Sequence, residues 1–293
     1  MNKLNLKNTE WTGVVTSFYC QCCYEKGAGD LPCDKQRQKA VQFFRSYFSK
    51  KGMNPHNLMT MEKIPFQGIL NVAVRNRIID SCVQRLVRED PGRPIVNIGC
   101  GFDTRFFRLE NYCGKYYDVD FYNVIRAKKN ILSKSAARDY FLQPCNNAFS
   151  GRFIRHELDL DRADPIIICE GVFCYIPYLQ VVNFVRDLFS RYPKATLICD
   201  VFLYQQHLVF SDMKSRLLLK YPEDGEKRYR KHEKWYRMMD HIRKRLTNSK
   251  ISASLKNVTV LQEVYTPENE ETVYLNGREY IPEYWIGIYE RKG

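Results

Sequence analysis

The sequence predicts an α/β protein built on a doubly wound, mainly parallel sheet. Three observations lead to this fold class. From residue 94 onward, short strand-like runs alternate with helical patterns. Some of these runs, such as Ile166–Cys169, are apolar at every position, as in strands covered on both faces. A turn of two glycines directly follows the first run, at residues 99–101. Alternating β and α units place the strands parallel, with helices on both faces of the sheet.

The segment before the first strand predicts helices. Residues 41–48 place apolar side chains on one helical face, and Lys51-Gly52 is a suitable stop. Residues 78–87 show a clearer amphipathic repeat, which ends at Asp90-Pro91-Gly92 because proline cannot continue a helix. We therefore predict an N-terminal helical region over residues 1–92.

Five strands are expected in the central part of the chain, with helices between several of them. The apolar runs predict these strands at 95–98, 115–120, 153–158, 166–169 and 195–199. A helix follows the glycine turn, and the clearest of the later helices covers 181–189 and ends at Tyr192-Pro193. Strand-like segments at 258–264 and 284–289 close the chain, and the short connection predicts that they pair antiparallel.

A basic stretch interrupts the sheet pattern between residues 205 and 250. It predicts two helices, at 206–220 and 227–247, joined by residues 221–225. The stretch holds 13 Lys and Arg against 6 Asp and Glu, which is +7 of the formal +13 of the whole chain. Such charge favours an acidic partner, such as a phosphorylated molecule, RNA or an acidic peptide, but it also suits a solvated helical surface.

Composition narrows the class of protein further. With 293 residues and 44% hydrophobic content, the chain can bury a large core, which excludes a disordered protein and a small disulfide scaffold. It has no apolar run of about 20 residues, and its start lacks the apolar core of a signal peptide. Eleven cysteines, an odd number, indicate reduced thiols, so we expect a cytoplasmic location.

The cysteines do not predict a metal site. Cys20, Cys22 and Cys23 form one tight group, and Cys33 stands apart from it. Structural zinc sites in proteins usually combine two such pairs of ligands, and the second pair is missing here. We therefore expect no metal.

The most informative local pattern is the glycine turn together with the acid that follows it. Gly99 and Gly101 allow a sharp turn and a close approach of ligand to backbone. A pyrophosphate-binding turn would carry a third glycine near position 104, where this chain has threonine. Asp120, 21 residues after Gly99, ends the next strand and suits ribose hydroxyls. The pattern predicts an adenosyl ligand without pyrophosphate, S-adenosylmethionine, and its alternative is a tight turn beside a solvated aspartate.

Three segments together resemble the leucine carboxyl methyltransferase family. They are Gly-x-Gly-Phe-Asp-Thr-Arg-x-x-Arg-Leu at 99–109, Tyr-Asp-Val-Asp-Phe at 117–121 and Cys-Glu-Gly-Val-Phe-Cys-Tyr-Ile at 169–176. The resemblance covers about residues 65–200. It implies a class I, Rossmann-like methyltransferase fold that depends on S-adenosylmethionine. In that fold a seven-stranded, mainly parallel sheet ends in an antiparallel strand, and here it would carry a helical insertion.

The resemblance also implies the roles of individual residues. Arg75 corresponds to the arginine that holds the methionine carboxylate of the cofactor, and Asp120 to the acid that binds the ribose. The other implied contacts are Gly99 and Gly101 under the cofactor, Asp159 and Leu160 beside the adenine, Glu170 near the sulfonium and Tyr175 orienting the acceptor. The family usually carries a further basic residue in an N-terminal helix, but residues 17–23 contain no lysine or arginine.

The activity implied by the resemblance is methyl transfer to a carboxylate. The acceptor would be the C-terminal leucine of the protein phosphatase 2A catalytic subunit, and the product of the cofactor would be S-adenosylhomocysteine. A carboxylate is already ionised at neutral pH, so this reaction needs no general base. The alternatives are a wybutosine-type transfer-RNA carboxyl methyltransferase, a small-metabolite O-methyltransferase, and a binding protein without catalysis. No membrane partner is expected.

These expectations divide the chain into three parts. Residues 1–92 would pack on the cofactor site and partly close it. Residues 93–204 and 251–293 would form the methyltransferase core, and residues 205–250 would form a basic lid over the acceptor channel.

Overall fold

The computed structural model describes most of the first two thirds of the chain and the closing strands. The described residues are 11–25, 34–50, 66–132, 139–150, 152–158, 160–162, 164–202, 258–265, 273–275, 278–280 and 284–291. The predicted insertion helices, 206–220 and 227–247, lie outside these ranges.

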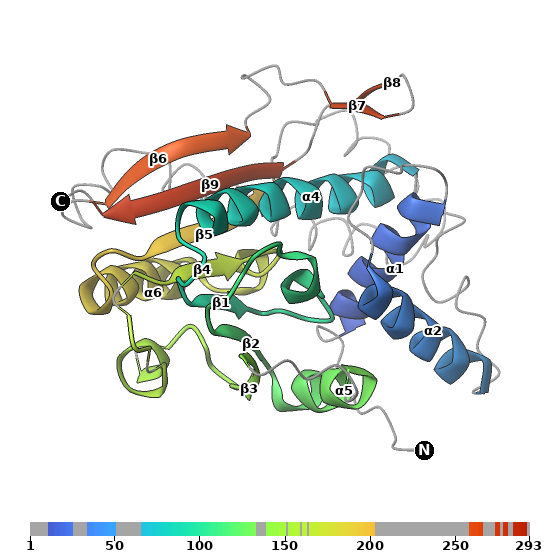
Figure 1. Ribbon diagram of the computed structural model, residues 1–293, viewed down its shortest axis with the longest axis horizontal. Coiled ribbons are helices and arrows are strands. Elements are labelled where there is room, and N and C mark those ends of the chain that lie inside the picture. The colour runs from blue at the N-terminus through green and yellow to red at the C-terminus, as the bar shows by residue number, and fades with distance from the viewer. Residues whose placement is uncertain are drawn as a thin grey trace, which may run out of the picture.

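A seven-stranded sheet is the centre of the fold, with strand order β3-β2-β1-β4-β5-β9-β6 (Figure 1). Its first five strands are parallel, while β9 is antiparallel to both β5 and β6. Its members are β1 (Ile95–Ile98), β2 (Tyr116–Asp120), β3 (Tyr140–Pro144), β4 (Ile166–Cys169), β5 (Thr196–Phe202), β6 (Val258–Tyr265) and β9 (Tyr284–Arg291). Strands β7 (Val273–Leu275) and β8 (Arg278–Tyr280) form a separate pair. The predicted fold class and the antiparallel pairing of the two closing strands are confirmed.

Two apolar clusters on opposite faces of the sheet explain why the central strand β4 is apolar at every position. Ile166 and Ile168 of β4 belong to one cluster, and Ile167 and Cys169 belong to the other. Successive side chains of a strand point to opposite faces, so a strand covered on both sides has to be apolar at every position.

One long helix covers each face (Figure 1). The helix α4 (Phe66–Glu89) packs Ile79, Val83 and neighbouring residues on one face, and α6 (Tyr178–Arg191) packs Phe184 and Leu188 on the other. Helix α4 begins well before the predicted amphipathic segment at 78–87. This extension carries Arg75 and Asn76 to the end of the sheet, where they become important below.

Three further helices pack together beside the glycine turn. The helices α1 (Trp11–Glu25), α2 (Lys35–Lys50) and α5 (Tyr122–Leu132) share an apolar cluster with Phe102, which follows the turn. Asp34 fixes the start of α2, because its Oδ1 accepts hydrogen bonds at 2.8 Å from the backbone N–H groups of Gln36 and Arg37. Its Oδ2 accepts one from Thr104 Oγ1 at 2.5 Å. The N-terminal helices are thereby attached to the turn.

The predicted strand at 153–158 is wrong. Residues Phe153–Glu157 form a short π-helix (η2), and the strand beside β2 is β3 at Tyr140–Pro144. Phe153, Ile154 and Leu158 are all buried in one cluster, a spacing that suits a helical turn against the core and not strand alternation. The apolar run therefore indicated burial correctly but not the backbone conformation.

The helix predicted after the glycine turn is only a four-residue 3-10 turn, η1 (Arg105–Arg108). Both arginines point into a cluster of carboxylates described below, so side-chain ion pairs fix this segment where a longer backbone helix was expected. The remaining predicted strands and the helix at 181–189 agree with β1, β2, β4, β5 and α6. None of the helices in the described ranges has the length and apolarity that crossing a bilayer requires.

Candidate functional site

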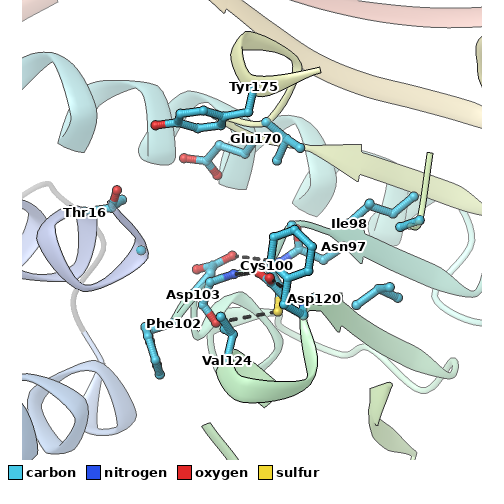
Figure 2. A pocket seen from close by; sticks show the side chains of 18 of the residues that line it. Thr16, Asn97, Ile98, Cys100, Phe102, Asp103, Asp120, Val124, Glu170 and Tyr175 are labelled. Carbon is cyan, nitrogen blue, oxygen red and sulfur yellow. Dashed lines mark hydrogen bonds between the residues drawn. The ribbon is translucent and has the colours of Figure 1, made fainter. Parts of the chain in front are cut away.

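A cavity of about 580 Å³ lies at the carboxyl ends of the parallel strands, where ligands bind in open α/β sheets. The ends of β1, β2, β3 and β4 form its floor, and α1, α2 and α4 contribute its remaining walls. Figure 2 shows Glu170 and Tyr175 on one side of this cavity and Cys100, Asp103 and Asp120 on the opposite side. Its size suits a ligand of cofactor dimensions.

The glycine turn forms the tightest part of the wall. Gly99 has φ +69°, and a Cβ there would lie 2.4 Å from Cγ2 of Val172. Gly101 has φ +50°, and a Cβ there would lie 3.2 Å from Cα of Gly13 in α1. Both positions combine a left-handed backbone with a close neighbour, so glycine is required. The turn thus brings β1, α1 and the end of β4 together around the cavity.

Asp120 closes the turn from the neighbouring strand. Its Oδ2 accepts a hydrogen bond from the Gly101 N–H, and its Oδ1 accepts one from the Phe121 N–H, both at 2.7 Å. Burial raises the pKa of Asp120, and these two hydrogen bonds oppose that shift. An ionised carboxylate has about four acceptor positions, so two remain for the hydroxyls of a ligand.

Arg75 lies between two carboxylates, Glu170 directly after β4 and Asp200 within the adjacent strand β5. Its Nε donates to Glu170 Oε1 at 3.1 Å, and its Nη1 donates to Asp200 Oδ2 at 3.2 Å. All three side chains line the cavity. Burial raises the pKa of Asp200, while the charge of Arg75 opposes the shift. A guanidinium has five N–H donors in a planar arrangement, which suits an anionic ligand.

A network of buried ion pairs supports Glu170 from behind. Arg105 is fully buried and contacts three carboxylates: Asp80 and Glu170 at 2.6 Å each and Asp103 at 2.8 Å. Arg108 joins the same network through Asp80, Asp103 and Asp34. Burial raises the pKa of Asp103, but the neighbouring arginines lower it more, so it lies well below the usual range. The network keeps Asp103 ionised and gives Glu170 a charged partner on the side away from Arg75.

Tyr175 lies at the mouth of the cavity. It ends the short 3-10 turn η3 (Phe173–Tyr175), and 48% of its surface is exposed. In Figure 2 its hydroxyl is directed toward the side of the cavity on which Thr16 of α1 lies. A side chain in this place can contact both a buried ligand and a second molecule that enters from outside.

Comparison with known proteins fits this arrangement. The family model described as leucine carboxyl methyltransferase matches residues 37–188, just over half of the chain. This protein belongs to the leucine carboxyl methyltransferase family. The matched segment contains α4, the glycine turn, Asp120 and Glu170, so most of the residues that line the cavity lie within it.

Single relatives are more distant. The S-adenosyl-L-methionine-dependent methyltransferase dpfgK of Gibberella zeae is 25% identical over 127 residues, and the match spans 41% of this chain and 42% of that protein. Among solved structures, magnesium protoporphyrin IX methyltransferase from Synechocystis PCC 6803 with bound SAH has a TM-score of 0.45 at 12% identity, covering 86% of this chain and 99% of that one. PKMT2 from Rickettsia typhi in complex with AdoHcy has a TM-score of 0.43 at 11% identity, covering 69% and 49%. The fold assignment therefore rests on the strand order of the chain itself.

S-adenosylmethionine is the cofactor of this leucine carboxyl methyltransferase family member, and the residues present fit it. Arg75 offers a guanidinium for its carboxylate, which planar N–H donors bind well. Asp120 offers the two remaining acceptor positions for a ribose diol. Gly99 and Gly101 line the cavity without side chains, so a ligand can approach their backbone.

The structure brings most of the predicted site residues together. The predicted residues that line the cavity are Arg75, Gly99, Gly101, Asp120, Glu170 and Tyr175. Their individual roles remain predictions. Asp159 lies outside the described residues. Leu160 packs against the apolar core cluster and is not among the residues that line the cavity.

The wall at the end of β3 is made by Cys145–Phe149, which the sequence did not predict as part of the site. Asn147 is fixed there by a hydrogen bond of 3.2 Å from Gln180 Nε2. The sequence predicted the third strand at 153–158, so residues 145–149 were not expected at the carboxyl edge of the sheet. A strand predicted at 140–144 would have placed them there.

Two charged residues of the cavity were also missed. Arg37 of α2 is 2% exposed, lines the cavity, and donates from Nη2 to Asn76 Oδ1 at 2.9 Å. Arg37 brings a second guanidinium to the cavity. The N-terminal segment 17–23, where the family usually carries a basic residue, has no lysine or arginine. Asp200 lies within β5, two residues before its end, and was not singled out, although an acid directly after the apolar run 195–199 was a usable signal. No cluster of metal-ligating side chains occurs in the part of the chain that the structure describes.

Proposed function

We propose that this protein methylates a carboxylate at the end of a protein chain, the C-terminal leucine of the protein phosphatase 2A catalytic subunit. The observation that carries this proposal is the state of the cavity acids. Each is held in ion pairs or backbone hydrogen bonds, and none of the described lining residues is a histidine. The acids are Asp103, Asp120, Glu170 and Asp200. The lining thus supplies no histidine as a general base and engages its acids with protein partners, and an ionised carboxylate acceptor needs no base.

Under this proposal the chain acts by alignment and by exclusion of water. The bound cofactor supplies an electrophilic methyl group, which forms a bond to the acceptor oxygen as the carbon–sulfur bond breaks and its electron pair passes to sulfur. Arg75 and Asp120 hold the two ends of that ligand against the glycine turn. Tyr175 orients the acceptor at the mouth, and proximity and orientation supply much of the rate.

The surroundings of the mouth favour a protein acceptor over a small metabolite. The described residues include five exposed large apolar side chains, and four of them lie at or next to the cavity lining. These four, Phe121, Tyr122, Tyr175 and Leu179, are called the apolar rim below. Phe121 and Tyr175 line the cavity, while Tyr122 and Leu179 are next to lining residues in the sequence. Exposed apolar side chains around a cavity favour a binding surface for a larger acceptor, because a small metabolite inside the cavity would not need those outside it.

The deciding experiment supplies the purified protein with S-adenosylmethionine labelled in its methyl group and with three acceptors in parallel. The acceptors are the phosphatase catalytic subunit, the same subunit without its last leucine, and bulk transfer RNA. Base-labile label on the intact subunit alone supports the proposal. Label on transfer RNA supports the alternative acceptor class. Equal label on both forms of the subunit would show that the carboxylate of the terminal leucine is not the acceptor.

Because an ionised acceptor needs no general base, the rate of the chemical step should be nearly constant from about pH 6 to 9. The pKa of a terminal carboxyl is about 3.3–3.7, so the acceptor stays ionised over this whole range. Single-turnover rates at saturating cofactor measure the step directly. A rise with an apparent pKa of about 7 to 9 would instead indicate a general base and a hydroxyl or amine acceptor.

The apolar rim gives a second test. Leu179 is 71% exposed and does not line the cavity. We expect Leu179→Ser to raise KM for the protein acceptor about threefold or more. The substitution removes apolar area that would be buried in the complex, and the binding free energy lost is of order 1 kcal/mol. Affinity for S-adenosylmethionine should not change. Phe141→Ser is the matched control, since Phe141 is the fifth exposed large apolar residue and lies outside the rim. Equal effects of both variants would show that the rim has no special role.

A further inference from the structure

Asp200 of β5 lies beside the residue that follows the end of β4, so two acids come together there. In the parallel pair β4–β5, Cys169 is the register partner of Cys199. The next residues, Glu170 and Asp200, therefore lie side by side at the carboxyl edge. Asp200 is only 3% exposed, yet it lines the cavity. A buried carboxylate is costly unless it is hydrogen-bonded and paired, so its contacts indicate its role.

Those contacts hold one guanidinium on three sides. Asp200 Oδ2 accepts from Arg75 Nη1 at 3.2 Å, and Glu170 Oε1 accepts from Arg75 Nε at 3.1 Å. The third side is Gly171, which has φ +64° and where a Cβ would lie 3.2 Å from Arg75 Nη2. Asp200 also fixes this glycine, because its Oδ1 accepts the Gly171 N–H at 2.5 Å. One carboxylate thus anchors both the arginine and the backbone on which the arginine packs.

We propose that Asp200 is a positioning residue for Arg75, which it orients toward the carboxylate of S-adenosylmethionine. This inference rests on the proposed role of Arg75 as the ligand of that carboxylate. Glu170 accepts from Nε and Asp200 accepts from Nη1, so the two acids hold different atoms of the guanidinium. Two contacts at different atoms define the plane of the group. A planar donor binds a carboxylate well only when its N–H groups are aimed at both oxygens.

The proposal can be tested by whether neutralising Asp200 strengthens or weakens cofactor binding. A carboxylate beside Arg75 repels the carboxylate of the cofactor. If Asp200 acted only through charge, neutralising it would strengthen cofactor binding. If Asp200 orients Arg75, neutralising it weakens binding, and only for ligands that carry the carboxylate.

The experiment compares Asp200→Asn with the parent protein by isothermal titration. Asparagine keeps an oxygen that can accept the Gly171 N–H but loses the charge that holds Arg75. The ligands are S-adenosylmethionine and its decarboxylated analogue, which lacks only the carboxylate. We expect affinity for the first to fall about tenfold and affinity for the second to change less than about twofold, as for groups coupled through a shared contact. Equal losses for both ligands would indicate a merely structural role, and tighter binding of the first would indicate charge repulsion alone; either result overturns the proposal.

Two further variants separate this inference from the proposed role of Arg75. Arg75→Met should lower affinity for S-adenosylmethionine and leave the decarboxylated analogue unaffected. If it lowers neither, the role of Arg75 itself is wrong. If it lowers the first but Asp200→Asn does not, only the positioning role of Asp200 fails. In the Arg75→Met background, Asp200→Asn should cause little additional loss, because its partner is gone.

Asp164→Asn is the matched control for the loss of an aspartate. Asp164 pairs with Arg162 at 2.7 Å and does not line the cavity. We expect this variant to bind both ligands as the parent does. Urea unfolding of every variant shows whether the fold is kept, and the comparison of the two ligands remains valid for any variant that stays folded.

Discussion

Replacing Asp120 by alanine is expected to lower the affinity for S-adenosylmethionine at least tenfold. A hydrogen bond to a charged group contributes about 1.5–3 kcal/mol, and the free acceptor positions of Asp120 suit two ribose hydroxyls. The variant also loses the two hydrogen bonds by which Asp120 holds the N–H groups of Gly101 and Phe121. Isothermal titration measures the affinity, and circular dichroism checks that the fold is intact.

Asp161→Ala is the matched control for Asp120→Ala. Asp161 is an exposed carboxylate that pairs with Lys115 on the surface at 2.8 Å. Its removal should leave cofactor affinity unchanged. Unchanged affinity in Asp120→Ala as well would show that another acid binds the ribose.

The pH dependence of binding gives Asp120 a separate signature. The ionised form of this carboxylate is the one that accepts from two hydroxyls and two N–H groups at once. Burial raises its pKa, so its proton binds at a higher pH than in an exposed aspartate. Affinity for the cofactor should therefore fall on acidification at a higher pH than an ordinary aspartate would cause. This dependence should be absent in Asp120→Asn.

The largest loss of stability is expected from Arg105→Met. Arg105 is fully buried between Asp80, Asp103 and Glu170. Removing one member of a buried ion network leaves the other charges buried without compensation, which costs about 3–5 kcal/mol. We expect a decrease of that size in the free energy of unfolding, measured by urea denaturation. Methionine retains the apolar part of the side chain, so the loss reports mainly on the charge.

Arg162→Met provides the comparison for a network near the surface. Arg162 also contacts two carboxylates, Asp90 and Asp164, but its side chain is 38% exposed. Exposed ion pairs contribute about 0–1 kcal/mol because water screens them. If the two variants lost similar stability, burial of the Arg105 network would not be the cause of its effect.

The same network predicts how stability depends on pH. The pKa of Asp103 in the folded protein lies well below its unfolded value, because the lowering by Arg105, Arg108 and Arg37 exceeds the raising by burial. Asp103 therefore stabilises the fold above the ordinary aspartate pKa, and this contribution is lost only as the pH falls toward the lowered value. In Arg105→Met that lowering is weaker, so less of the contribution is present at neutral pH.

The sequence by itself determined the layers of this fold and the glycine end of its site. Runs such as Ile166–Cys169 predicted buried parallel strands, because a strand covered on both faces tends to be apolar at every position. Gly99 and Asp120 could be connected because parallel strands carry their carboxyl ends to the same edge. These patterns are local, because each one reflects the geometry of a single strand or turn.

Only the tertiary structure decided which segment became β3 and which side chains share Arg75. The run at 153–158 and the strand at 140–144 differ in what they pack against, and their local composition does not show this. Asp200 follows Arg75 by 125 residues, and Arg37 precedes Asn76 by 39. Strand order and helix packing create these contacts, and neither leaves a periodic trace in the sequence. The partners of a buried charge come from distant parts of the sequence, so its role can be assigned only from the folded structure.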